Sequence, residues 1–141
     1  FISNGMFSGC KKLNNLVIPN SVTSIGRNAF GDCDSLENLI LPNSITTIGM
    51  FAFTNCISLK NIIIPEGVTG IEEATFQGCH KLTSITIPKS VTYIDSYAFS
   101  ECDALLTVNF AGTQEDWKKI YISSTYNDAI KNVTINYNYQ Y

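Results

Sequence analysis

The chain has 141 residues, of which 45% are hydrophobic and 15% are charged, and its formal net charge is -3 at pH 7. An average domain carries about 25% charged residues, and a weakly acidic chain lacks the basic surface that attracts nucleic acid and anionic membranes. No apolar run approaches the roughly 20 residues needed to span a bilayer. We therefore expect one elongated interaction domain, with no nucleic-acid partner and no membrane insertion of this chain.

Two residue types recur at an interval of 23 positions along the chain. The series are Phe7, Phe30, Phe53, Phe76 and Phe99, and Cys10, Cys33, Cys56, Cys79 and Cys102. Self-similarity at a fixed period of about 20 to 50 residues is typical of a solenoid, in which each unit buries its apolar face against its neighbours. The period predicts a curved solenoid of about five related coils.

Each unit starts with an L-x-x-L-x-L motif, for which Leu36, Leu39 and Leu41 are one example. The alternation over residues 39–41 is the period-2 pattern of a short strand with one buried face. Pro42 follows and has no N–H for a sheet ladder, so the strand should end there. We predict one such strand per coil, stacked in parallel about 4.8 Å apart. The equivalent segments are residues 16–18, 62–64, 85–87 and 108–110.

The pattern changes after Phe110. Thr113 stands three residues before Asp116, a capping-box variant that predicts a short helix. Trp117 follows and is expected to cover the end of the core rather than to serve as a platform for a ligand. Apolar residues at 130, 133 and 135 restore the strand motif two residues later than the period requires.

These patterns divide the chain into three parts. We predict a repeat array over residues 1–110, an atypical closing coil with a short helix and a last strand over residues 111–136, and a tail or linker at residues 137–141. The array starts in mid-repeat without the polar cap that terminal repeats need. We therefore expect it to be truncated at its N-terminus and to be a piece of a longer protein.

The motif spacing matches leucine-rich repeats, whose period is about 20 to 29 residues. The unit sequences IPNSVTSIGRNAFGDCDSL and LPNSITTIGMFAFTNCISL resemble the 23-residue BspA-like class over residues 1 to 110. Thr75 departs from its usual alanine, and Glu72 and Asp95 depart from its usual glycine. The resemblance implies an α/β-type solenoid, a right-handed superhelix with a parallel sheet on its concave face. It also implies a secreted or cell-surface protein of host-associated anaerobic bacteria or parasitic protists, with a role in adhesion.

The residues that could carry chemistry favour packing over catalysis. All five cysteines occupy one column of the repeat, so we predict that they are reduced and buried, and that they pack as small hydrophobic residues. The alternatives are disulfides between neighbouring coils and a metal site. A metal site is disfavoured because a ladder of parallel side chains does not converge on one metal ion. His80 is the only histidine and has no triad partners. Acidic residues flank Cys33 and Cys102 but not the cysteines between them, which disfavours a calcium site. We predict no catalytic residue, no metal and no cofactor.

The outward side of the strand face is the best candidate for a partner-binding surface. Between the buried positions stand Asn15, Val17, Asn38, Ile40, Asn61, Ile63, Ser84 and Thr86, followed by Thr107, Asn109, Asn132 and Thr134. None of these is charged, and the three aliphatic residues form an apolar stripe on adjacent coils. Exposed apolar patches with polar rims often mark interaction sites. The alternatives are the general preference of strands for β-branched residues and cover by another segment of the parent protein.

Two functional classes remain. The first is a non-catalytic protein-binding or adhesion module of a cell-surface or secreted protein, with a protein partner on a host or neighbouring cell; a glycan is the alternative partner. The second is a structural spacer in a larger multidomain protein. The full-length sequence would decide between them, because it would reveal a signal peptide, a wall anchor or further domains.

Overall fold

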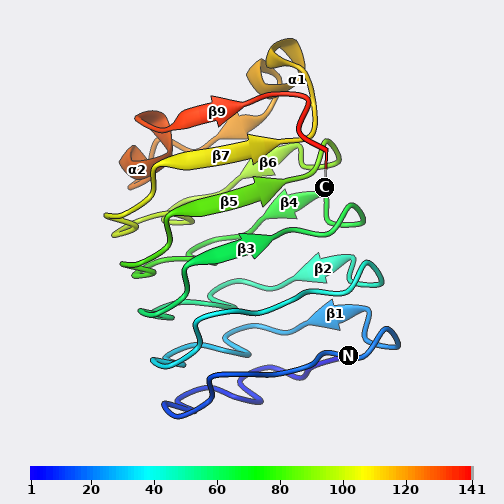
Figure 1. Ribbon diagram of the computed structural model, residues 1–141, viewed down its shortest axis with the longest axis vertical. Coiled ribbons are helices and arrows are strands. Elements are labelled where there is room, and N and C mark those ends of the chain that lie inside the picture. The colour runs from blue at the N-terminus through cyan, green and yellow to red at the C-terminus, as the bar shows by residue number, and fades with distance from the viewer. Residues whose placement is uncertain (141) are drawn as a thin grey trace.

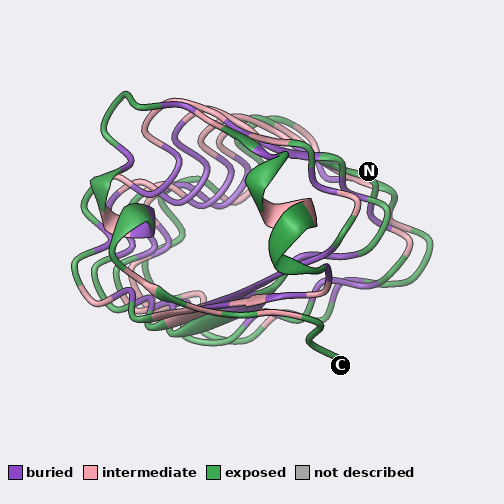
Figure 2. Ribbon diagram, turned by 90° about the horizontal axis from the view of Figure 1, so that it is seen from above, coloured by how far each residue is buried: buried purple, intermediate pink, exposed green. Residues whose placement is uncertain are grey.

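The computed structural model describes residues 1–140, which form a single stack of coils rising from the N-terminus to the C-terminus (Figure 1). Viewed along the stack, each coil is a flattened ring in which buried, half-buried and exposed residues alternate along the chain (Figure 2). The elements are β1 (Ser24–Ile25), β2 (Thr47–Ile48), β3 (Asn61–Ile63), β4 (Gly70–Ile71), β5 (Ser84–Ile87), β6 (Tyr93–Ile94), β7 (Thr107–Phe110), α1 (Gln114–Lys118), β8 (Tyr121–Ile122), α2 (Asp128–Lys131) and β9 (Thr134–Asn136). The predicted solenoid of 23-residue coils is confirmed.

Two sets of parallel strands, rather than the predicted one strand per coil, run along the stack. The predicted strands form the sheet β3-β5-β7-β9, and a second set forms the sheets β1-β2 and β4-β6-β8 on the opposite side of the coil. Each strand of the second set has only two residues, as in the Ser24↔Thr47 and Ile25↔Ile48 pairing. Two residues cannot establish an alternation, so the sequence pattern did not reveal them.

The prolines shorten the first sheet as predicted. The pairing of β3 with β5 ends at Ile63↔Thr86, whereas that of β5 with β7 continues to Ile87↔Phe110. Ala111 stands where earlier coils have proline, and its N–H donates to the carbonyl of Ile87 at 3.1 Å, an ordinary length for such a bond. In the first coils this face is held only by isolated bridges such as Val17↔Ile40.

Stacked phenylalanines run through the core. Neighbouring rings from Phe7 to Phe99 lie 5.2, 5.5, 5.5 and 5.6 Å apart between centroids and are nearly parallel. The four from Phe30 onward have no exposed surface. Such pairs contribute about 0.5 to 1.5 kcal/mol beyond the burial of their area, so each coil is stabilised by the next.

The cysteine column lies beside the rings, and four of its members are buried as predicted. Each buried thiol also donates to the carbonyl of the phenylalanine of the preceding coil, as Cys56 does to Phe30 at 3.1 Å and Cys79 to Phe53 at 3.2 Å. All five cysteines are free thiols. The prediction was wrong for Cys10, which is exposed and lies in the first described coil, at the end of the stack.

Two further columns of the coil have left-handed backbone. Their members are Gly5, Asn28, Phe51, Ala74 and Tyr97, and Gly9, Asp32, Asn55, Gly78 and Glu101, with φ between 52° and 72°. Only Gly5, Gly9 and Gly78 are the residue type that adopts this conformation without strain. The tight turns on this side of the coil are therefore imposed by stacking, even on bulky residues.

The closing coil has the predicted helix and last strand. Thr113 caps α1 in a capping box with Asp116, and the Trp117 ring packs edge-on against Phe110 with centroids 5.2 Å apart. The predicted tail at residues 137–141 is described up to Gln140, and Tyr141 lies outside the described residues. The domain boundaries at residues 110 and 136 stay predictions.

In the closing coil, the side chain of a buried asparagine takes the place of a backbone hydrogen-bond acceptor. In earlier coils the N–H of each core phenylalanine donates to a carbonyl of the next coil, as Phe76 does to Ala98 at 3.0 Å. The N–H of Phe99 donates instead to the side-chain Oδ1 of Asn127 at 3.1 Å. The Nδ2 of Asn127 donates to the carbonyls of Asp95 and Ser123, at 2.7 and 3.0 Å. This role was not predicted from the sequence.

Candidate functional site

The predicted apolar stripe is exposed in the first three coils. Val17 is 90% exposed, Ile40 is 83% exposed and Ile63 is 49% exposed. The chain neighbours Leu39 and Leu41 are buried, which follows from the alternation of side chains along an extended segment. The same two-residue alternation that directs Leu39 and Leu41 into the core therefore directs the apolar side chain of Ile40 into solvent.

Two adjoining hollows lie along this stripe and together form the groove. The larger has a volume of about 520 Å³ and is lined by Asn20, Asn38, Leu39, Ile40, Leu41, Pro42, Asn43, Asn61, Ile62 and Ile63. The smaller, of about 360 Å³, is lined by Asn15, Leu16, Val17, Ile18, Asn20, Asn38, Ile40 and Pro42. The two hollows share Asn20, Asn38, Ile40 and Pro42. They are therefore parts of one surface.

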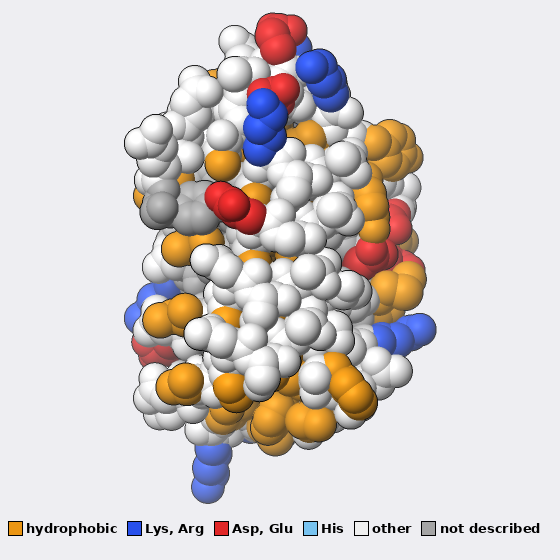
Figure 3. Space-filling view, turned by 90° about the vertical axis from the view of Figure 1, so that its right-hand side faces the viewer, with side chains coloured by type: hydrophobic (Ala, Val, Ile, Leu, Met, Phe, Trp, Pro, Cys, Tyr) orange, Lys and Arg blue, Asp and Glu red, His pale blue; other side chains and the backbone are white. Residues whose placement is uncertain are grey.

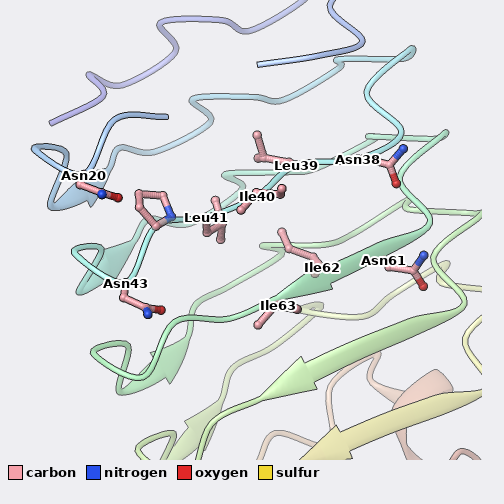
Figure 4. Close-up of a pocket in the computed structure, with 10 residues that line it drawn as sticks. Asn20, Asn38, Leu39, Ile40, Leu41, Asn43, Asn61, Ile62 and Ile63 are labelled. Carbon is pink, nitrogen blue, oxygen red and sulfur yellow. The ribbon is translucent and has the colours of Figure 1, made fainter. Parts of the chain in front are cut away.

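Asparagines border the stripe on both sides. Figure 4 shows Asn38 and Asn61 on one side of the isoleucines, and Asn20 and Asn43 on the other. Asn20, Asn38 and Asn43 are exposed and make no side-chain hydrogen bond to any described residue. Asn61 differs, because its Oδ1 accepts a hydrogen bond from Ser84 at 2.6 Å. Three carboxamides, each with donors and an acceptor, are thus available to a ligand.

Asn20 and Asn43 were missed as site residues. Both follow the proline that ends the strand motif, in the sequences Pro19-Asn20-Ser21 and Pro42-Asn43-Ser44. The signal that could have identified them is this repeated position, which was interpreted only as the end of a strand.

The predicted surface does not extend over the whole sheet. Thr86 was expected to point outward, but only 5% of it is exposed, and Ser84 is half-buried and bonded to Asn61. Asn109 is also half-buried and accepts a hydrogen bond from Asn136 at 2.9 Å. The alternation correctly assigns the side of the sheet, but it contains no information on what later segments cover. Asn132 and Thr134 in the last coil are exposed as predicted, but the exposed apolar side chains of this face are confined to the first three coils.

The lining of the groove is uncharged, although the exposed ion pair of Lys60 with Glu37 lies at the chain positions next to Asn61 and Asn38. No lining residue of either hollow is ionisable. In the view toward the ends of the front strands, charged side chains gather at the top of the stack around α1, and hydrophobic side chains gather toward its base (Figure 3). A ligand could enter the groove without the desolvation of an unpaired charge, which is costly.

His80, the only histidine, and Tyr93 each form an isolated pair with one acidic residue. The Nδ1 of His80 lies 2.9 Å from a carboxylate oxygen of Asp103, and both side chains are exposed. The hydroxyl of Tyr93 donates to the carboxylate of Glu72, which raises the pKa of Tyr93 to about 12. Within residues 1–140 no group of three metal-binding side chains occurs. None of these pairs assembles a reactive centre.

None of the described helices is long and apolar enough to cross a bilayer. The two helices, α1 and α2, have five and four residues.

Comparison with solved structures relates the chain to bacterial repeat proteins. A leucine-rich repeat protein of T. pallidum, TpLRR, is 34% identical with a TM-score of 0.74, over 77% of this chain and 50% of that one. A leucine-rich cell surface protein of Faecalibacterium prausnitzii is 38% identical with a TM-score of 0.60, over 76% of this chain and 34% of that one. The pneumococcal vaccine antigen PcpA shares the fold, with a TM-score of 0.75 over 99% of this chain and 39% of that one, at 23% identity.

The chain spans half or less of the length of these three structures. No curated protein matches it. The sequence profile of the BspA type leucine rich repeat region matches residues 1–128 in six copies. This chain therefore belongs to the BspA type leucine-rich repeat family.

Proposed function

We propose that this chain is a non-catalytic binding module of a cell-surface or secreted protein, and that it binds a protein partner across the groove. The observation that carries the proposal is the exposure of Val17 and Ile40, at 90% and 83%, within a hollow that has no charged lining residue. Fully burying an aliphatic side chain of this size contributes about 1.5 to 3 kcal/mol. A partner that covers both side chains would therefore be bound favourably.

The rigidity of the face supports the same proposal. The groove residues belong to consecutive coils held by the phenylalanine stack, so little conformational entropy is lost when a partner binds. Solenoids commonly use such extended surfaces for binding. Surface localisation agrees with the relative from Faecalibacterium prausnitzii, which is described as a cell surface protein.

The test compares the wild-type chain with Ile40→Glu/Ile63→Glu on intact epithelial and bacterial cells. The two substituted side chains are exposed, so the melting temperature should be unchanged, whereas binding should fall at least tenfold. Thr47→Glu/Thr69→Glu is the matched control, because it adds the same charge at exposed positions outside the groove. Trypsin treatment of the cells should abolish binding if the partner is a protein.

Two results would contradict the proposal. Binding that is equally lost in the control variant would indicate a general charge effect. Saturable binding that survives Ile40→Glu/Ile63→Glu would move the site elsewhere, and the absence of saturable binding to either cell type would favour the structural spacer.

A further inference from the structure

The chain itself carries a segment that crosses the ends of its coils. After β9, residues 137–140 leave the ring of the last coil and pass outside the front strands (Figures 1 and 2). Asn138 has φ 54°, which turns the backbone. The N–H of Asn138 donates to the carbonyl of Gly112 at 2.8 Å, and that of Tyr139 to Phe110 at 3.0 Å. This segment is thus held at the strand end through its backbone.

The groove lies in the same columns of the repeat, three coils earlier. Phe110 and Gly112 stand 69 residues, or three periods of 23, after Leu41 and Asn43, which line the larger hollow. The surface that residues 137–140 cross in the last coils is therefore repeated, without any covering segment among the described residues, in the first coils.

Exposure along the outward column that contains Val17 differs from coil to coil. It is 90% at Val17, 83% at Ile40, 49% at Ile63 and 5% at Thr86, and the next two members, Asn109 and Asn136, are half-buried and exposed. The large exposed apolar side chains of this column are therefore confined to the first three coils.

The chemistry of the groove fits a polypeptide. Its floor is aliphatic and its lining contains no aromatic ring, although aromatic side chains are the groups that provide flat stacking surfaces. The free carboxamides of Asn20, Asn38 and Asn43 each offer one acceptor and two donors, which complements the C=O and N–H of a peptide group. Residues 137–140 likewise contain amides and tyrosines and no charge.

We propose that the groove binds an extended polypeptide segment without charged side chains, which lies across the first three coils as residues 137–140 lie across the last ones. The proposal rests on the proposed function and names the partner as an extended chain rather than a glycan or a folded surface. Large apolar side chains of the segment fill the two hollows, and the asparagines bind its backbone.

The probe is an acetylated and amidated peptide of sequence Asn-Tyr-Asn-Tyr-Gln, which copies residues 136–140. Methyl NMR spectra of the full chain are recorded during titration with this peptide. We expect saturable shifts at the methyl groups of Val17, Ile40 and Ile63, with an affinity at least tenfold weaker in Ile40→Glu/Ile63→Glu and unchanged in Thr47→Glu/Thr69→Glu. Replacement of both peptide tyrosines by aspartate should also weaken binding at least tenfold.

This proposal is overturned if the peptide gives no saturable shift at millimolar concentration, if the shifts lie outside the groove, or if the aspartate peptide binds equally well. Saturable shifts with a neutral oligosaccharide alone would assign the groove to glycans. If cell binding depends on Ile40 and Ile63 while the peptide does not bind, the proposed function stands and the peptide site fails. If the peptide binds in the groove while cell binding does not depend on Ile40 and Ile63, the peptide site stands and the proposed function fails.

Discussion

Asn127→Ala should destabilise the closing coil far more than its size suggests. Asn127 has no exposed surface and links three backbone groups, the N–H of Phe99 and the carbonyls of Asp95 and Ser123, at 2.7 to 3.1 Å. A hydrogen bond contributes about 1 kcal/mol net, and a buried group left without a partner costs about 1 to 3 kcal/mol. We expect a loss of about 3 kcal/mol or more.

The assay is native-state hydrogen exchange combined with thermal unfolding. Because repeat proteins can open from an end, the amide of Phe99 and the backbone of residues 120–136 should lose protection first. Asn132→Ala is the matched control, since Asn132 is exposed and its side chain makes one long hydrogen bond of 3.4 Å. The structural role assigned to Asn127 is refuted if the two variants exchange and melt alike.

Three further perturbations test the packing, and a fourth tests the backbone. With a thiol reagent, only Cys10 should react in the native protein and five cysteines after denaturation without reductant, whereas one or three would reveal disulfides. Burial raises the pKa of Cys33 to about 11 and of Cys102 to about 12. The neutral buried thiols should therefore contribute fully to the free energy of unfolding below about pH 8.5, where unfolded thiols are neutral too, and this contribution should be lost as the pH rises through the raised pKa values. A free energy of unfolding from chemical denaturation that is constant from pH 8 to 11 would contradict this. Trp117→Ala should cost about 3 kcal/mol, the lower end for large-to-Ala changes, because the ring is half-buried; unchanged melting would show that it is no lid. Glu101→Gly should raise the free energy of unfolding by about 0.5 to 1 kcal/mol, because Glu101 has φ 58° and left-handed backbone costs residues with a Cβ about 1 to 2 kcal/mol. The control Glu115→Gly in α1 should lower it by about 1 kcal/mol. If urea unfolding shows both variants stabilised or both destabilised, the left-handed strain assigned to Glu101 is wrong.

The sequence predicts those parts of the fold in which the same residue type recurs in every repeat. Phe30 and Cys33 recur because their columns are buried and hydrogen-bonded in every coil after the first, and Thr113 with Asp116 carries a local capping signal. The left-handed columns could not be predicted, because stacking imposes that backbone on residues as different as Phe51 and Gly5. Asn127 could not be predicted either, since its partners Phe99 and Asp95 lie 28 and 32 residues away.

Only the part of the candidate site that depends on local sequence could be predicted. Alternation assigns Val17, Ile40 and Ile63 to the outside of the coil, because side-chain direction is a local property of an extended segment. The burial of Thr86 and the position of Asn43 at the groove depend on how distant segments and neighbouring coils meet. Local periodicity contains no information on those contacts.

The most direct test of the central claim is photocrosslinking from the groove. A benzophenone amino acid is placed at position 40, or at position 47 as the control, and each chain is illuminated while bound to cells. We expect a protein adduct from position 40, at a yield that excess unlabelled chain reduces, and none from position 47. Adducts from position 47 alone, or equal adducts from both positions, would contradict the claim that the groove is the binding surface.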